Sequence, residues 1–249
     1  MAAKIQRALM LEAPGHPEVL RIVAPNPGPM TLEGTNTYLF GSDPCVVIDP
    51  GSDDPGHLDA IRAAATERGG IGLVLLTHSH GDHTAGADKL GAEVVLPAGG
   101  EEHFALRVLA TPGHAEDHVC FLTETGVCFS GDLVLGLGST IVPPGGNSLA
   151  AFMDSLALLQ AQEIELIAPG HGPWITDPVA KLAEYVEHRQ MRERRLLAAL
   201  EKGERSRAQL LAAVWDDIPI ELLPMAAMAM EAHLEKLEGE GRLPEDLIS

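Results

Sequence analysis

The chain has 249 residues, of which 45% are hydrophobic and 21% charged, and its mean hydropathy is +0.08. This composition is typical of a globular protein that buries a substantial core, and it excludes a disordered or fibrous chain. The formal net charge of −19 disfavours nonspecific binding to nucleic acid or to anionic lipid.

No apolar run in the sequence has the length that a bilayer requires, and the N-terminus lacks the apolar core of a secretory signal. We therefore expect a cytoplasmic protein with no membrane partner. The cysteines Cys45, Cys120 and Cys128 each lie in an apolar, strand-like run and form no CxxC pair, so we expect buried, reduced thiols.

Short apolar runs separated by Gly, Pro and Asp turns fill residues 1–170 and predict strands. The expected strands are Val19–Val23, Thr35–Phe40, Cys45–Ile48, Leu73–Thr77, Glu93–Leu96, Arg107–Ala110, Val119–Thr123, Val127–Ser130 and Glu165–Ala168. Segments between them predict helices, which we expect over Gly56–Arg68, Thr84–Leu90 and Ser148–Gln162. Strands interleaved with helices indicate an α/β protein built in layers.

The pattern changes to almost continuous helix after Asp177, which is followed by a proline suited to the first helical position. Apolar residues at helical spacing predict one long helix to about Lys202, and shorter helices follow on either side of a break near Pro219. This tail has the size of a winged-helix domain. We expect three parts: a main domain over 1–176, a connecting helix over 177–203 and a winged-helix-like domain over 204–249.

The strongest chemical signal directly follows the strand expected at Leu73–Thr77, where the chain reads His78-Ser79-His80-Gly81-Asp82-His83. Three imidazoles and a carboxylate so close together cannot be packed core elements, because each buried polar group would need a partner. A metal ion supplies all of these partners at once, so the HxHxDH spacing predicts a metal site. The alternative is a polar loop with chance histidines.

Three more residues share one local context, in which an apolar strand and a glycine turn precede the polar side chain. They are His114 in ATPGH, Asp132 in CFSGD and His171 in APGHG. Strands that end at the same edge of a sandwich would bring all seven side chains together. Seven donors exceed the four that one tetrahedral zinc takes, and they suit two metals that share a ligand. Taken singly, His114 and His171 have the ordinary turn histidine as an equal alternative.

In this order, THSHGDHTAG, TPGH, FSGD and PGHG resemble the metallo-β-lactamase superfamily over about residues 17–175. The resemblance implies an αββα sandwich, in which two mixed sheets pack face to face with helices outside and the active site lies at one edge. It implies one metal held by His78, His80 and His114, a second held by Asp82, His83 and His171, and Asp132 as the bridging ligand.

The same resemblance implies supporting roles. Asp82 would orient the attacking water and accept its proton. Asp49, in the strand end VVIDPG, would orient ligands through hydrogen bonds, with a turn-capping aspartate as the alternative. Independently of the resemblance, the position of His118 four residues after His114 favours a hydrogen bond within the site, with a cap on the strand that it heads as the alternative.

Three less specific motifs are GTNTYLF, AFMDSLALL and YVEHRQMRERRLLAAL. They resemble the branch that contains a mitochondrial β-lactamase-like endoribonuclease and its bacterial relatives. That branch implies metal-dependent cleavage of single-stranded RNA. Arg189, Arg192, Arg194 and Arg195 could bind phosphate, with a solvated helix face as the alternative. The aromatic content of 4% provides few platforms for stacked bases.

We therefore expect a hydrolase that uses a hydroxide bridged by two zinc ions, with manganese or iron as alternative metals. The expected substrate is a phosphodiester, namely single-stranded RNA, or an ester-type small molecule. The alternatives are a glyoxalase II-like thioester hydrolase or lactonase, an iron-dependent sulfur dioxygenase, and a nucleic-acid-binding regulator with a vestigial metal site. The sequence leaves the oligomeric state open, with a homodimer as one alternative.

Overall fold

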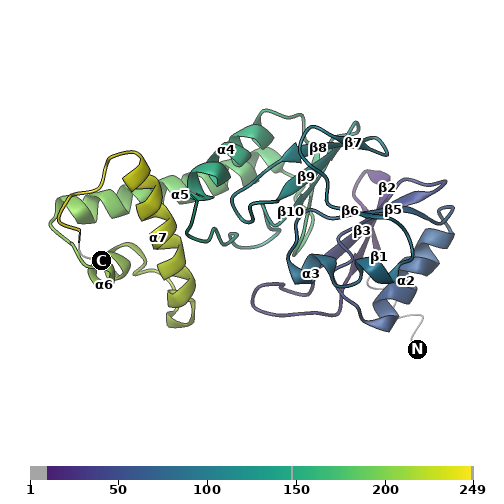
Figure 1. Ribbon diagram of the computed structural model, residues 1–249, viewed down its shortest axis with the longest axis horizontal. Helices are drawn as coiled ribbons and strands as arrows, with labels where there is room; N and C mark the ends of the chain where they lie inside the picture. The colour runs from purple at the N-terminus through teal and green to yellow at the C-terminus, as the bar shows by residue number, and fades with distance from the viewer. Residues whose placement is uncertain (1–9, 147, 248–249) are drawn as a thin grey trace.

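Two mixed β-sheets pack face to face in the computed structural model, which describes residues 10–146 and 148–247 (Figure 1). The first sheet has the order β1 (Met10–Ala13), β2 (His16–Val23), β3 (Asn36–Phe40), β4 (Cys45–Ile48), β5 (Ile71–Leu75) and β6 (Val94–Val95). The second has the order β11 (Leu166–Pro169), β10 (Val127–Gly131), β9 (Val119–Thr123), β8 (Leu106–Ala110) and β7 (Glu102–His103). Parallel pairs join β4 to β5, β5 to β6 and β10 to β11, and the other neighbours are antiparallel.

Helices cover the outer face of each sheet. Helix α2 (Pro55–Thr66), capped by the Asp54 side chain, packs on the first sheet. Helices α4 (Ser148–Gln160) and α5 (Pro178–Glu201) pack on the second (Figure 1). The predicted αββα sandwich of the metallo-β-lactamase fold is therefore confirmed.

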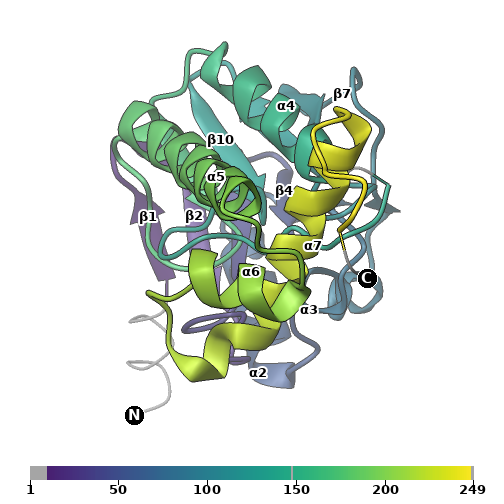
Figure 2. The ribbon, with the colours of Figure 1, turned by 90° about the vertical axis from the view of Figure 1, so that its left-hand side faces the viewer.

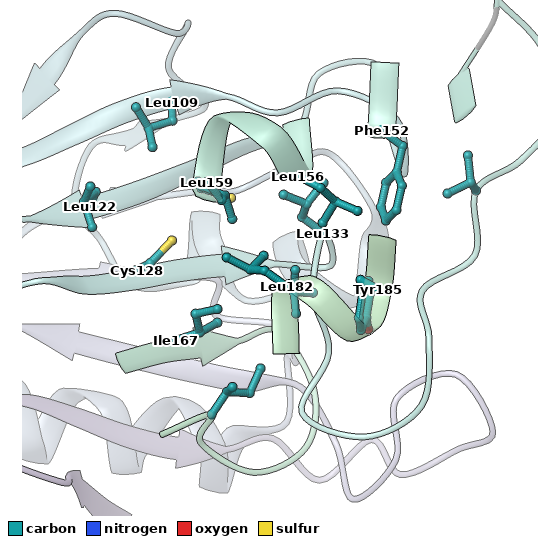
Figure 3. Close-up of a cluster of buried hydrophobic side chains, with 14 of the residues drawn as sticks. Leu109, Leu122, Cys128, Leu133, Phe152, Leu156, Leu159, Ile167, Leu182 and Tyr185 are labelled. Atoms are coloured by element: carbon teal, nitrogen blue, oxygen red, sulfur yellow. The ribbon is translucent and has the colours of Figure 1, made fainter. Parts of the chain in front are cut away.

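The strand sequences explain why both faces of each sheet are covered. In β4, Cys45 and Val47 point into the core beneath α2, whereas Val46 and Ile48 point into the core between the sheets. Side chains of a strand alternate between faces, so an unbroken apolar run such as CVVI needs a layer on either side. Strands β9 and β10 alternate in the same way, and Figure 3 shows Cys128 of β10 among the leucines of α4.

All nine expected strands are present, with bounds shifted by a few residues. Strands β1 and β7 were not expected. The helix expected over Thr84–Leu90 is wrong in its bounds, because the structure has α3 (Gly81–Thr84) and a separate 3-10 turn, η1 (Ala87–Lys89). The Asp82 carbonyl accepts the Thr35 hydroxyl at 2.8 Å, and the Gly86 amide donates to the Pro50 carbonyl at 2.9 Å. These two bonds replace the helical bond that would have joined α3 to η1.

The C-terminal segment is helical, as expected (Figure 2). Helix α6 (Arg207–Val214) starts at a capping box on Ser206, and η2 (Ile220–Leu222) leads into α7 (Leu223–Gly239). Residues 206–247 contain helices and no strand. Helix α5 serves two cores, since Leu182 packs beneath α4 and Leu196 packs against α6 and α7. The division of the chain after residues 176 and 203 stays a prediction.

The three cysteines are free and buried, as expected. Within the described part of the chain, no helix combines the length and the apolar character needed to cross a membrane.

Candidate metal centre

The seven candidate ligands all lie where strands of the sandwich end. His78 and His80 follow β5, Asp82 and His83 lie in α3, His114 lies in the turn between β8 and β9, Asp132 follows β10, and His171 follows β11. The structure brings them together in three overlapping groups, within each of which the ligand atoms lie within 4.8 Å of one another. These groups are His78, His80 and His114; His78, His83 and Asp132; and Asp82, His83 and His171.

The first group consists of three imidazoles. His80 Nδ1 lies 2.9 Å from His78 Nε2 and 3.0 Å from His114 Nε2. His78 is fully buried, whereas His80 is exposed, so one side of this group opens to solvent. His114 is fixed from behind, because its Nδ1 lies 2.8 Å from the Ile141 carbonyl and donates to it. This arrangement leaves Nε2 of His114 free to bind a cation.

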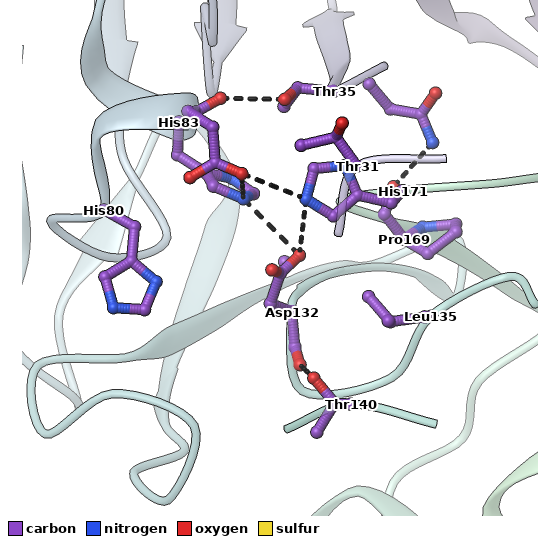
Figure 4. A network of polar contacts seen from close by, with 12 residues as sticks. Thr31, Thr35, His80, His83, Asp132, Leu135, Thr140, Pro169 and His171 are labelled. Atoms are coloured by element: carbon purple, nitrogen blue, oxygen red, sulfur yellow. Dashed lines mark hydrogen bonds and ion pairs between the residues drawn. The ribbon is translucent and has the colours of Figure 1, made fainter. Parts of the chain in front are cut away.

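We take the remaining four ligands, Asp82, His83, Asp132 and His171, as the second group, and it contains buried polar atoms that the protein leaves without hydrogen bonds. Figure 4 shows His83, Asp132 and His171 pointing toward one another. Asp132 Oδ1 lies 3.4 Å from both His83 Nε2 and His171 Nε2, and His171 Nε2 also lies 3.4 Å from Asp82 Oδ2. His83 Nε2, His171 Nε2 and Asp132 Oδ1 are all buried without a hydrogen-bond partner. Such atoms destabilise a fold unless something else satisfies them.

A divalent cation fits this group. Four ligands held tetrahedrally at about 2.0–2.1 Å from a metal lie roughly 3.3 Å from one another, which is close to the observed 3.4 Å separations. One cation would therefore satisfy all three unpaired atoms. Asp132 faces both groups, since its Oδ2 also lies 3.7 Å from His114 Nε2. That position suits the bridging role that the sequence predicts for it.

The charges of the site also favour a cation. Burial is the main reason that the pKa of His78 falls to about 2 and that of His118 to about 3, so both imidazoles stay neutral. Burial alone would also lower the pKa of His171, but the carboxylates of Asp132 and Asp82 raise it to about 9. The His171 imidazole, 3.4 Å away, lowers the pKa of Asp82 to about 2. The second group is thus a place where two carboxylates attract positive charge.

Asp49 supports the site by orienting His83. Its Oδ2 accepts from His83 Nδ1 at 2.8 Å and from the Thr77 hydroxyl at 2.7 Å, and its Oδ1 accepts from the Thr77 amide at 2.8 Å. The Asp49 backbone has a φ of +49°, a left-handed conformation that aspartate tolerates better than most residues. These bonds turn His83 Nε2 toward Asp132, as the predicted orienting role requires.

His118 contacts the site through the backbone amide of Asp132 and not through the side chain of a candidate ligand. Its Nδ1 lies 2.9 Å from the Thr111 hydroxyl, and its Nε2 accepts from the Asp132 amide at 3.2 Å. These bonds are those expected of a residue that supports the site, and the role of His118 stays a prediction. Gly131 precedes Asp132 with a φ of +46°, and a Cβ there would lie 2.7 Å from His118 Nε2, so the turn requires glycine.

Several supporting residues were not predicted. Asn36 Nδ2 donates to the carbonyls of Pro169 and Gly172, at 2.9 and 2.8 Å, and so fixes the loop that carries His171. The Thr140 hydroxyl donates to the Asp132 carbonyl (Figure 4). Asn36 lies in the GTNTYLF segment, which did carry a family signal, whereas Thr140 lies in a glycine-rich loop with no chemical pattern.

A pocket of about 360 Å³ includes His114 and Asp132 in its wall. Most of its lining is apolar and comes from the loop after β2, the loop after Asp132, the segment between α6 and η2, the 3-10 turn η2 and helix α7. The apolar lining residues are Pro29, Met30, Leu32, Leu135, Leu137, Ile141, Trp215, Ile218, Leu222, Met225, Ala226 and Ala229. Met30 and Leu137 are about half exposed, so the pocket presents apolar surface to solvent.

The arginines of α5 do not form the exposed basic patch that a phosphate-binding helix requires. Arg192 pairs with Asp217, Arg194 with Glu187, and Arg195 with Asp216. Arg189 and Arg192 are buried, each 5% exposed. The alternative interpretation, a solvated helix face, is also wrong for Arg189 and Arg192, because α6 and the loop after Asp132 cover that side of α5.

Comparisons with known proteins agree with this geometry. Residues 30–103 match the metallo-beta-lactamase superfamily model, and residues 206–246 match the beta-lactamase associated winged helix domain. The atrochrysone carboxyl ACP thioesterase of Aspergillus chevalieri is 38% identical over 217 residues, which cover 77% of this chain and 68% of that protein. A beta-lactamase-like protein 2 homolog of Drosophila melanogaster is 33% identical over an alignment of 266 positions, gaps included, which spans 90% of this chain and 89% of that protein.

A solved structure agrees as well. The structure of a metallo-beta-lactamase family protein from Thermus thermophilus is similar to this one, with a TM-score of 0.75 and 25% sequence identity. The similar region covers 92% of this chain and 95% of that protein. Neither curated relative is named as an endoribonuclease, so that branch stays a prediction. From its fold, its converging histidines and aspartates and these relatives, the chain belongs to the metallo-β-lactamase superfamily of hydrolases, with a C-terminal segment that matches the associated winged-helix domain.

Proposed function

We propose that this hydrolase uses two zinc ions to cleave the thioester of an apolar acyl group. The observation that carries the proposal is the apolar pocket whose wall includes His114 and Asp132, so that an acyl chain in the pocket ends at the metal centre. A thioesterase among the relatives supports the same substrate class. We therefore favour thioester hydrolysis over phosphodiester cleavage, because the arginines of α5 do not form an exposed basic patch.

Zinc is the metal that the donor set favours. Five imidazoles and two carboxylates form the set, and imidazole with carboxylate at tetrahedral spacing suits zinc, although iron and manganese accept the same donors. His78, His80 and His114 would hold one ion, Asp82, His83 and His171 the other, and Asp132 would contact both. Bound there, two divalent cations would supply hydroxide at neutral pH and polarise the substrate carbonyl. Measuring the metal content of the purified protein tests this assignment.

The residues of the chain then determine the course of the reaction. Asp82 is half buried and its carboxylate is ionised at neutral pH, so it can orient a water molecule and accept its proton. A carbon–oxygen bond forms at the carbonyl carbon and the carbon–sulfur bond breaks. The products are a carboxylic acid and a thiol, with the proton passing from Asp82 to the departing sulfur. Apolar walls hold the acyl group and exclude bulk water from it.

The test offers the metal-loaded protein a panel of thioesters with acyl groups of increasing apolar size, together with single-stranded RNA. We expect kcat/KM to rise with the apolar size of the acyl group until the pocket is filled. Asp82→Ala should abolish turnover, whereas Asp88→Ala, an exposed aspartate in η1, should leave it unchanged. Cleavage of RNA without turnover of any thioester would refute the proposal and restore the phosphodiester as substrate.

A further inference from the structure

A buried guanidinium without a carboxylate partner lies in the wall of the pocket. Arg189 on α5 is 5% exposed, and its Nη2 donates to the Ser139 hydroxyl at 3.1 Å and to the Thr140 carbonyl at 2.5 Å. The guanidinium also lies 5.2 Å from the centre of the Phe152 ring. Among residues 10–146 and 148–247, no carboxylate forms an ion pair with it.

Of the four arginines on α5, Arg189 alone lacks a carboxylate partner among the described residues. Arg192, Arg194 and Arg195 each have an aspartate or glutamate partner, in a chain with 36 acidic and 17 basic side chains. A buried charge without a counterion destabilises the fold, so a counterion from outside the chain would be bound favourably. Burial lowers the pKa of Arg189 to about 10, which leaves the guanidinium charged at neutral pH.

The rest of the pocket wall favours an anion at this position. Asp132 is the only carboxylate in the lining, and it belongs to the metal centre. His188, also in the lining, stays neutral, because burial and then the positive charges of Arg189 and Arg192 lower its pKa to about 4. No negative charge of the described chain therefore stands between Arg189 and a ligand in the pocket.

We propose that Arg189 binds an oxyanion carried by the substrate while the thioester carbonyl lies at the metal centre. This inference rests on the proposed thioesterase function and adds the substrate class, which is an anionic thioester. The oxyanion is a carboxylate of the acyl group or a phosphate of the thiol, since a guanidinium binds either with charge-assisted hydrogen bonds.

The experiment compares pairs of thioesters that differ only in charge. Monothioesters of hexanedioic and octanedioic acid with N-acetylcysteamine are paired with the hexanoyl and octanoyl thioesters, which places the charge on the acyl group. Hexanoyl-4′-phosphopantetheine is paired with hexanoyl-pantetheine, which places it on the thiol. We expect the charged member of one pair to have a kcat/KM at least tenfold higher, and the favoured pair identifies the source of the oxyanion.

Variants of Arg189 test its part in that preference. Arg189→Gln keeps donors toward Ser139 and Thr140 but removes the charge, so we expect kcat/KM to fall far more for the charged member of the favoured pair than for its neutral partner, which abolishes the preference. Arg189→Lys should restore part of the preference. Arg194→Gln, on the same helix but outside the pocket and paired with Glu187, is the matched control and should leave the preference unchanged. Circular dichroism confirms that each variant is folded.

Two outcomes overturn the proposal. One is a wild-type protein that cleaves both members of every pair equally well. The other is an Arg189→Gln protein that loses charged and neutral turnover to the same extent, as a purely structural role would predict. If no thioester is cleaved at all, the proposed function fails, and calorimetric titrations with octanedioate and with 4′-phosphopantetheine decide the inference. Equal affinity of the wild-type and Arg189→Gln proteins for each of these two ligands would then refute it.

Discussion

The substitution Gly170→Ala tests the metal centre without removing any ligand. A Cβ on Gly170 would lie 2.4 Å from Asp132 Oδ1 and 2.8 Å from His83 Cε1. The Gly170 backbone is not in the left-handed region, so an alanine there meets a steric obstacle and no conformational one. The added methyl group thus pushes directly on two of the side chains that converge on the second group of ligands.

The size of the effect follows from these distances. Ordinary contacts of a Cβ begin near 3.4 Å, so the Asp132 carboxylate must retreat by about 1 Å. Metal–ligand distances tolerate about 0.2 Å, and the loss of a supporting contact alone costs 10- to 100-fold in metal affinity. Displacing two ligands together should lower the metal affinity of the second group by ~100-fold, or ~2.7 kcal/mol. Overpacking should lower the stability of the metal-free fold by only ~1–3 kcal/mol.

Competition with a chromophoric chelator measures the metal affinity, and elemental analysis measures the metal content. Gly81→Ala is the matched control, because Gly81 lies inside the HxHxDH motif yet a Cβ there meets nothing within 4 Å. We expect this variant to bind metal as the wild-type protein does. A folded Gly170→Ala protein with two equivalents of metal at unchanged affinity would refute the reasoning that Asp132 and His83 share one ion.

Three further predictions concern the metal ligands, their support and the buried histidines. Asp132→Ala should lose bound metal and hydrolysis together, and a normal metal content by elemental analysis would contradict the bridging role. Asp49→Asn should weaken metal binding 10- to 100-fold in chelator competition, because it removes the charge that orients His83, and an unchanged affinity would exclude that role. His233 is buried with both ring nitrogens unpaired, and burial lowers its pKa to about 3. The unfolded chain therefore takes up a proton below pH 6.5 that the folded chain does not. Between pH 7 and pH 5, the unfolding free energy of the wild-type protein in urea denaturation should fall by ~2 kcal/mol more than that of His233→Leu. An equal fall in the two proteins would show that His233 is protonated in the fold.

The sequence brought together the residues of the candidate metal centre because each candidate ligand follows a strand that could be recognised by itself. The apolar run before His78 and the FSGD and PGHG turns are local patterns, and the ends of strands in one sandwich meet at one edge. Local pattern and global topology therefore agree at every ligand. The prediction needed no knowledge of which strands are neighbours.

Long-range polar contacts could not be predicted in the same way. Arg192 and Arg195 were interpreted from their own helix, where glutamates alternate with arginines, but their partners are Asp217 and Asp216 in the segment after α6. Thr140 also has no local signal, because its function depends on how the loop folds back on the Asp132 carbonyl. Such contacts are set by tertiary packing, which a single sequence does not display.

The sharing of α5 between two cores limits how the protein can be divided. Leu196 and Leu200 face α6 and α7, so a cut at Gly203 would leave an apolar half-helix attached to the sandwich without its cover. A chimera that grafts a foreign tail onto this enzyme should keep the native α5 only as far as Tyr185 or import a donor helix in the same rotational phase. The position at which native and foreign sequence are best joined therefore lies inside α5 and not in a linker.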